Sequence, residues 1–346
     1  MILRCLHVVC CAVVVCSCGS GLSAVGAERP AIVPERITID RPEATEQLLL
    51  WKTGTADRQV DATREVKWTT VPEGIVRVDT RGRVIPVSDG EARIQATGEG
   101  ISLSIPVTVS GFARAEPVSF REEIIPILTK ARCNSGGCHG KAEGQNGFRL
   151  SIFGFDTEAD HAALLKESRG RRVSVTSPDD SLLLLKGSAR VPHGGGRKIE
   201  PGSLRDRRLR RWIAEGARFD APTEETSTVQ SIEIEPADQS LLAGETQQIR
   251  VVAVDSTGNR HCVTAEAEFE SNAEAIATVD ERGLVTAGDV PGEAAVLVRF
   301  LGHVSVCRIT LPRPGVNFSR PPEQNFIDGH VWNRLERLGI EPSGLS

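Results

Sequence analysis

The sequence is poor in aromatic residues and in methionine. Among its 346 residues, aromatics account for 4%, tyrosine is absent, and the single methionine stands at position 1. Hydrophobic cores must therefore be built from Val, Ile, Leu and Ala, which suits several small β domains. The length is enough for two to four domains.

A strong excess of charge of either sign is also missing. The formal net charge is −5, and 25% of the residues are charged against 40% that are hydrophobic, as in ordinary soluble globular proteins. Nothing in this balance favours nucleic acid as a partner. The sequence also has no Ser-His-Asp arrangement, metalloprotease motif or convincing carboxylate pair that would indicate a hydrolase.

Long hydrophobic runs are absent except at the N-terminus. Arg4 precedes a short apolar stretch at residues 8–15, and small residues then lead to Val25-Gly26-Ala27. This order is typical of a secretory signal peptide, and the run is too short to span a bilayer. The stretch Val15-Cys16-Ser17-Cys18 faintly resembles a lipoprotein cleavage box, so lipid anchoring stays an alternative. We expect residues 1–27 to be removed and the protein to be periplasmic, on the cell surface or extracellular.

An internal repeat divides the chain. Val78-Asp79-Thr80-Arg81-Gly82-Arg83-Val84 returns downstream as Val279-Asp280-Glu281-Arg282-Gly283-Leu284-Val285. Trp68 and Phe269 precede these motifs at equivalent positions, as do Thr63 and Thr264. Two copies at this separation predict two homologous modules that flank something different.

Each module has the pattern of an all-β domain. Short runs rich in Val and Ile alternate with turn signals, which favours a sandwich. Residues 34–110 and 228–312 resemble the bacterial immunoglobulin-like group 2 family, whose motif survives best as Ala277-Thr278-Val279-Asp280 followed by Gly283. The resemblance implies surface-exposed adhesive or spacer modules without catalytic residues, with a cell-surface or polysaccharide ligand as the partner.

The insert between the modules has a different texture. Helical patterns at residues 122–129, 160–167 and 204–215 are separated by Gly- and Pro-rich loops. Such a pattern describes a small α domain whose core a cofactor could complete. A polar linker at 222–228 then leads to the second module.

The most informative stretch of the insert is Cys133-Asn134-Ser135-Gly136-Gly137-Cys138-His139-Gly140. Haem c attachment normally uses C-x-x-C-H, in which two thiols add to the haem vinyl groups and the adjacent histidine lies beneath the iron. Here the gap holds four residues instead of two. Its glycines make it pliable enough to bulge outward while both sulfurs still reach.

The insert resembles the cytochrome c-like domain of large secreted planctomycete proteins. That family has an F-x-x-x-I-x-P-I-L helix before the cysteines, a P-x-x-S-L-L segment, and a closing L-x-x-W-I-x-x-G-A helix. These patterns match residues 120–128, 177–185 and 209–217. The resemblance implies that residues 117–221 form an all-α domain that carries haem c. Residues 325–342 resemble the start of the next domain in that family.

Three interpretations of the cysteine motif stay open. Covalent haem attachment through Cys133 and Cys138, with His139 as iron ligand, is the leading one. A Cys133–Cys138 disulfide is the plain alternative in an oxidising compartment. A zinc site with His161 or His193 is the third, although a second compact ligand pair is absent.

The sixth ligand of the iron follows from what the chain lacks. Methionine is the common choice in cytochromes c, but the only one is Met1, which export would remove. His193 stands in Val191-Pro192-His193-Gly194-Gly195-Gly196, roughly where related cytochromes place a Met-Pro-x-Gly loop. We therefore expect His193 as the second haem iron ligand, with His161 or an open site as alternatives.

The other cysteines and the basic clusters have weaker signals. By the repeat register, Cys307 matches Ile105, an inward position, and Cys262 matches Asp61 near a turn. A Cys262–Cys307 disulfide is a candidate that the sequence does not establish. The arginines at 169–172 and 205–211 are expected to be solvated, with haem propionates as the alternative partner.

After Pro322 the chain has one more amphipathic pattern, at residues 326–338. A lone helix with an apolar stripe either docks on a neighbour or begins a further domain, so residues 322–346 are expected to be the start of a truncated C-terminal helical domain.

The predicted fold class is multi-domain, with two all-β immunoglobulin-like sandwiches flanking a small all-α cytochrome c-like domain. The predicted function is that of an exported haem c protein that transfers single electrons to an unknown redox partner, with the β modules as adhesive or spacer domains. A haem-free adhesion or scaffold protein is one alternative. The binding portion of a larger enzyme, whose catalytic domain would follow, is the other. We expect an electron carrier or binding protein and name no catalytic residue.

Overall fold

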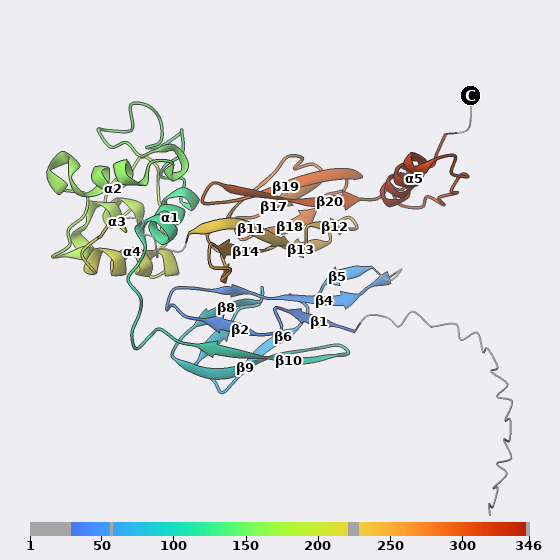
Figure 1. Ribbon diagram of the computed structural model, residues 1–346, viewed down its shortest axis with the longest axis horizontal. Coiled ribbons are helices and arrows are strands. Elements are labelled where there is room, and N and C mark those ends of the chain that lie inside the picture. Colours follow the sequence, from blue (N-terminus) through green and yellow to red (C-terminus); the bar gives the residue numbers. More distant parts are fainter. Residues whose placement is uncertain (1–28, 56–57, 221–227, 344–346) are drawn as a thin grey trace, which may run out of the picture.

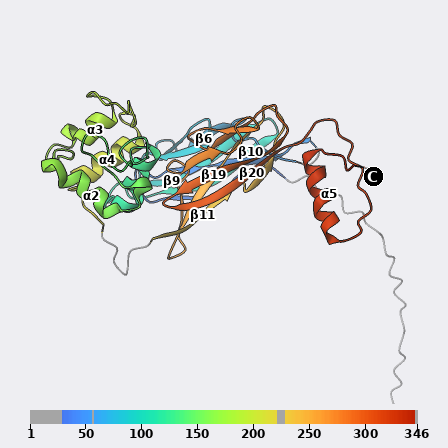
Figure 2. The same cartoon turned by 90° about the horizontal axis from the view of Figure 1, so that it is seen from above.

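The computed structural model describes residues 29–55, 58–220 and 228–343. The predicted signal peptide, residues 1–27, lies outside them. Two β domains lie side by side, here called the first β domain (residues 31–109) and the second β domain (residues 229–311). Residues 118–220, the middle segment, lie at one end of this pair, and a last helix lies at the other end (Figure 1). Figure 2 shows the same order from above.

The first β domain consists of ten strands. They are β1 (Ala31–Val33), β2 (Ile37–Ile39), β3 (Glu46–Gln47), β4 (Leu49–Thr53), β5 (Gln59–Asp61), β6 (Lys67–Val71), β7 (Val76–Val78), β8 (Arg83–Pro86), β9 (Gly90–Gly98) and β10 (Ile101–Val109). They form sheets in the orders β1-β4-β5, β2-β10-β9-β6 and β3-β8-β7.

The second β domain repeats this arrangement. Its strands are β11 (Val229–Glu235), β12 (Asp238–Ser240), β13 (Thr246–Gln248), β14 (Arg250–Asp255), β15 (Arg260–Cys262), β16 (Glu268–Ser271), β17 (Ala277–Val279), β18 (Leu284–Ala287), β19 (Gly292–Phe300) and β20 (His303–Leu311). The sheet orders are β11-β14-β15, β12-β20-β19-β16 and β13-β18-β17. Each strand takes the place of the strand ten numbers earlier, so the two β domains share one topology, as the repeat predicts.

Equivalent residues make equivalent contacts in the two domains. Thr63 Oγ1 accepts a hydrogen bond from the backbone N–H of Leu50 at 2.9 Å, and Thr264 Oγ1 accepts one from Val251 at 2.8 Å. Both threonines are buried, and each closes the corner after the fifth strand of its domain. The apolar cores are built almost wholly from Ile, Val, Leu and Ala, as the shortage of aromatics predicts.

The middle segment contains only short helices. They are η2 (Phe120–Ile124), α1 (Ile125–Lys130), η3 (Ile152–Gly154), α2 (Thr157–Leu165), η4 (Glu167–Gly170), η5 (Pro178–Asp180), α3 (Leu182–Gly187) and α4 (Leu204–Ala214). The four α-helices have 6, 9, 6 and 11 residues. Left-handed backbone at non-glycine residues recurs between them, at Arg132, Asn146, Phe153, Ser168, Arg169, Ala189 and Ala217. An α-helix cannot continue through such residues, which limits each helix to a few turns.

The predicted fold class is therefore wrong in its middle part. The structure is mostly β-sheet in two β domains, and no distinct all-α cytochrome c-like domain stands between them in the described part of the chain. Leu301 of the second β domain packs against the core of the middle segment as well as its own. The sequence pattern predicted helices in this segment. It did not predict that a residue of the neighbouring β domain would pack against their core.

Helix α4 attaches the middle segment to both β domains. Arg208 forms ion pairs with Glu123 of η2 at 3.3 Å and with Glu266 of the second β domain at 3.1 Å. It also donates to the carbonyl of Glu43 in the first β domain at 2.8 Å, and Arg211 pairs with the carboxylate of Glu43 at 2.8 Å. The arginine face expected to be solvated is thus largely an interface.

Helix α5 (Phe326–Leu338) ends the described chain. Asn325 caps its N-terminus, and Gly339, in left-handed backbone, ends it. Arg334 and Arg337 pair with Glu293 of the second β domain, but the apolar residue Phe326 is 79% exposed. Within residues 29–55, 58–220 and 228–343, no helix is both long and apolar enough to cross a membrane.

Candidate functional site

The loop that carries Cys133, Cys138 and His139 is closed by its own backbone. Helix α1 ends in a turn in which Cys133 N–H donates to the carbonyl of Leu128 at 2.8 Å. The chain then reverses, so that His139 N–H donates back to the carbonyl of Cys133 at 3.0 Å. The four-residue gap between the cysteines is therefore a compact turn that places His139 beside the residue where the motif began.

Gly140 makes this turn possible. A Cβ atom at this position would lie 2.2 Å from the carbonyl oxygen of Asn134, a distance that no side chain tolerates. The Cys-His-Gly ending singled out in the sequence therefore has a steric cause, because only glycine allows the two limbs of the loop to meet.

The imidazole of His139 is held by a hydrogen bond to the backbone. Its Nδ1 lies 3.0 Å from the carbonyl oxygen of Phe148. Because a carbonyl can only accept, Nδ1 carries the proton and the Nε2 lone pair of the neutral ring is left free. Burial lowers the pKa of His139, more than its bond to Phe148 raises it, and the neighbouring His193 lowers it further. The ring is thus kept neutral, the form that binds metals.

His193 has the same orientation on the facing loop. Its Nδ1 lies 2.9 Å from the carbonyl oxygen of Gly196, which again leaves Nε2 free. The ring centroids of His139 and His193 are 6.4 Å apart, and their planes differ by only 6°. The two loops therefore bring the two imidazoles together in a parallel, stacked arrangement.

Zinc and haem need different numbers of ligands from the protein. Among the described residues, no group of three or more His, Cys, Asp or Glu side chains could hold a metal ion, whereas a structural zinc needs four ligands. A porphyrin supplies its own four nitrogens, so two histidines suffice.

The two cysteines of the loop are free thiols. Burial raises the pKa of Cys133 to about 12, and the neighbouring Cys138 contributes in the same direction. At neutral pH Cys133 is therefore a protonated thiol. The disulfide interpretation is not realised in this structure.

His161, the alternative sixth ligand, lies elsewhere. Its Nε2 is 2.8 Å from the carbonyl oxygen of Ala217, and its ring packs edge-on against Phe120 at 5.0 Å. Trp212 and Phe219 complete the cluster. His161 is half-buried in an aromatic cluster, and its Nε2 is already hydrogen-bonded.

Arg172 is a positioning residue that sequence reasoning missed. Its guanidinium lies over the ring of Phe148 at 4.5 Å and donates to the carbonyl of Gly147 at 2.7 Å. Phe148 in turn contacts His139, with ring centroids 4.5 Å apart. Arg172 therefore braces the residue that orients the first histidine, a role hidden in a basic run that looked like a solvated surface.

Cys262 and Cys307 lie on different sheets of the second β domain. Cys262 is on β15, with its sulfur 3.3 Å from Thr264 Oγ1. Cys307 is fully buried on β20, opposite Val296, as its match to Ile105 predicts. Both are free thiols, so the candidate disulfide between them is not formed in this structure.

The sheets and the site geometry can be compared with known proteins. Residues 228–298 match the family model of the bacterial Ig-like domain (group 2). The match covers the second β domain up to β19, and the first β domain has the same strand order. It lies wholly outside residues 117–221, so the cytochrome resemblance of that segment stays a prediction. A search of curated proteins finds no relative of the chain.

Solved structures resemble the chain only distantly. The S-layer protein rSbsC(31-844) is 10% identical over 84% of this chain and 28% of its own, with a TM-score of 0.23. Domains 5-6 of SbsC are 11% identical over 83% of this chain and 98% of their own, with a TM-score of 0.32. Invasin, a bacterial integrin-binding protein, is 9% identical over 83% and 39%, with a TM-score of 0.18. The chain thus covers 28% of the length of rSbsC(31-844).

Proposed function

We propose that this chain is an exported scaffold protein whose bacterial Ig-like domain and its repeated partner hold a covalent haem c site in the middle segment. The scaffold half rests on the family match at residues 228–298 and on the common strand order of the two β domains. The haem half rests on the loop of Cys133, Cys138 and His139. Bacterial Ig-like domains fit a surface adhesion or spacer role.

One observation carries the haem proposal. His139 and His193 come from loops 54 residues apart, yet their rings are nearly parallel at 6.4 Å with both Nδ1 atoms bonded to carbonyls. Two unrelated surface histidines would not be expected to share this orientation, in which each Nδ1 is bonded to a backbone carbonyl and each Nε2 is left free. A shared metal ion between the two Nε2 atoms explains both bonds.

Each residue of the site has a distinct task in this proposal. Cys133 and Cys138 would hold the haem by thioether bonds, and His139 and His193 would be the two axial ligands. When bound, haem supplies one-electron chemistry. The protein orients the two imidazoles through Phe148 and Gly196, keeps His139 neutral by burial, and supports Phe148 through Arg172.

The test is expression of the full chain in a host with the cytochrome c maturation machinery. The wild-type protein is expected to keep its haem through acid–acetone extraction and denaturing gel electrophoresis, and to show a low-spin ferric spectrum. Cys133→Ala with Cys138→Ala should abolish covalent haem, and His193→Ala should turn the spectrum high-spin. Cys262→Ala, a thiol outside the loop, is the matched control and should leave haem unchanged. Haem that extracts freely, or none at all, would reject the site.

A haem-free adhesion or scaffold protein is the second candidate, favoured by the same family match. It predicts a colourless mature protein that folds fully and still binds a cell-surface or polysaccharide ligand. The spectrum therefore separates the two candidates, since the scaffold half survives a negative haem result.

A further inference from the structure

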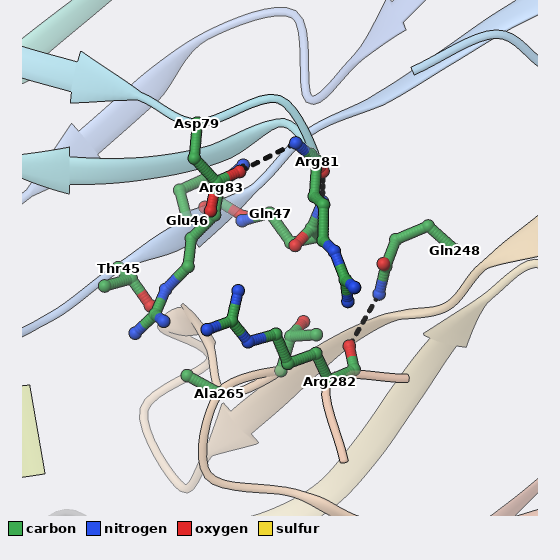
Figure 3. A pocket seen from close by; sticks show the side chains of 10 residues that line it. Thr45, Glu46, Gln47, Asp79, Arg81, Arg83, Gln248, Ala265 and Arg282 are labelled. Atoms are coloured by element: carbon green, nitrogen blue, oxygen red, sulfur yellow. Dashed lines mark hydrogen bonds between the residues drawn. The ribbon is translucent and has the colours of Figure 1, made fainter. Parts of the chain in front are cut away.

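A pocket lies where the two β domains meet, far from the cysteine loop in sequence. It is lined on one side by Asp79, Arg81 and Arg83 of the first β domain and on the other by Gln248 and Arg282 of the second (Figure 3). Its volume, including the part open to solvent, is about 350 Å³. The inner part has room for a group the size of a water molecule.

Three guanidinium groups point into this space (Figure 3). The Nε atom of Arg83 is shielded from solvent and has no hydrogen-bond partner among the described residues. Burial lowers the pKa of Arg83, the positive charges of Arg282 and Arg205 lower it further, and the carboxylates of Glu266 and Asp79 raise it in part. A buried guanidinium N–H without an acceptor is costly, and like charges around it add to that cost.

The carboxylates around the pocket are engaged elsewhere. Asp280 pairs with Arg81 at 2.6 Å, Glu46 with Arg250 at 3.0 Å, and Glu266 with Arg208 at 3.1 Å. Asp79 accepts from the backbone N–H groups of Arg81 and Arg83 at 2.8 and 3.0 Å. These carboxylates add negative charge near the pocket. None of them forms an ion pair with Arg83 or Arg282 in the described part of the chain.

Comparison of the two β domains shows that the fold does not require an arginine at position 83. Its equivalent in the second β domain is Leu284, in the same strand position of β18. A sandwich of this topology thus needs no arginine here. The first β domain places a charge where its partner has an apolar side chain, at the contact between the two.

We propose that this arginine pocket binds a small inorganic anion, a halide or one edge of an oxyanion such as sulfate or phosphate. The anion would accept from Arg83 and Arg282 together and so tie the first β domain to the second. Anions favour such converging guanidinium groups because several charge-assisted hydrogen bonds form at once.

Calorimetric melting of the full chain tests the proposal in chloride, sulfate or phosphate from 1 to 100 mM, with ionic strength held constant by gluconate, which is too large for the pocket. Wild-type protein should gain roughly 2–4 °C in Tm at an anion concentration several times the Kd. The Arg83→Leu variant, which copies Leu284, should lose this gain. Arg77→Leu, an exposed arginine on β7 with no pocket contact, should keep it.

The three anions separate the ligand sources. A gain with chloride alone indicates a halide site, and a gain with sulfate and phosphate indicates an oxyanion site. An equal gain in wild type and Arg83→Leu would be a general salt effect and would overturn the proposal. If Arg83→Leu does not fold, anomalous diffraction from wild-type crystals grown in bromide decides instead. A bromide peak between Arg83 and Arg282 supports the site, and its absence rejects it.

Discussion

The two β domains have one topology but use it differently. Their strands, sheet orders and corner threonines correspond one for one. Their sequences diverge where the domains touch. Asp61 of the first domain accepts from the backbone N–H of Gln248 at 2.7 Å, whereas its equivalent, Cys262, is a thiol whose pKa burial raises to about 12. The comparison teaches that the repeat preserves the positions that make the sandwich and varies those that join the two copies.

The middle segment is bound unequally to the two domains. Arg208 and Arg211 reach Glu43 in the first domain, and Arg208 also reaches Glu266 in the second. Lys130, by contrast, donates only to carbonyls of the second domain, those of Ala267 and Glu281. The middle segment therefore contacts the two β domains through different residues, although the two domains share one topology.

The largest effect is expected where all three parts meet. Arg208→Ala leaves the half-buried Glu266 without its arginine and leaves the buried Glu123 with Arg41 as its one remaining arginine partner among the described residues. Breaking a buried ion pair costs about 3–5 kcal/mol, so the free energy of unfolding should fall by about that amount in urea titration. Arg207→Ala, one residue earlier on the exposed side of α4, should cost little. Equal effects of the two variants would mean that the domains are joined by other contacts.

The second prediction concerns the pH dependence of stability that arises from Lys130, at the contact with the second β domain. Burial lowers the pKa of Lys130 from 10.5 to about 8. Between these values the unfolded chain binds more protons than the folded one, so this group makes the protein more stable as pH rises from about 8 to about 10.5, by about 2–3 kcal/mol. Lys130→Met should remove that rise. The measured quantity is the difference between wild-type and variant unfolding free energies across the range, since the buried thiols titrate in both. A difference that does not change with pH would refute the assignment.

The third prediction concerns what the domains share. Thr63→Val and Thr264→Val each leave a buried backbone N–H without an acceptor, at a cost of about 1–3 kcal/mol. The two losses should be alike because the two hydrogen bonds are alike. Thr108→Val, on the exposed face of β10, serves as the control and should be nearly neutral. Clearly unequal losses at Thr63 and Thr264 would show that the corners are equivalent in shape only.

The smallest effect is expected at the contact between the two repeated loops. Arg81 and Asp280 form an ion pair in which the side chains are 36% and 40% exposed. Exposed pairs of this kind contribute at most about 1 kcal/mol, and less in high salt. Arg81→Ala should therefore lower the unfolding free energy slightly at low salt and not measurably at about 1 M salt. A large loss that persists in salt would mean that this pair is a main joint between the domains.

Sequence reasoning predicted much of the local structure. The period-2 runs and turn signals indicated two β modules, and the repeat register placed Cys307 at a buried position opposite Val296. The helical patterns at 160–167 and 204–215 correspond to α2 and α4. These features depend on neighbouring residues along the chain, so a single sequence contains them.

The arrangement of the middle segment could not be predicted in the same way. The arginines of α4 read as a solvated face because nothing nearby in sequence pairs with them. Their partners, Glu43 and Glu266, lie 168 and 58 residues away from Arg211 and Arg208. The prediction of a distinct all-α domain was wrong for that reason. The spacing of apolar residues predicts which face of a helix is apolar, but it does not predict that another domain covers the charged face.

By itself the sequence determined the two repeated β modules, the residue types of their cores, and the loop in which Cys133, Cys138 and His139 stand together. Only the tertiary structure decided that His193 lies parallel to His139 at 6.4 Å and that Arg172 braces Phe148 behind it. It also decided that Arg83 and Arg282 meet across the domain contact. The physical reason is the same in each case. Periodicity and motifs report on chain neighbours, whereas ligand pairs and charge clusters form between residues that only packing brings together.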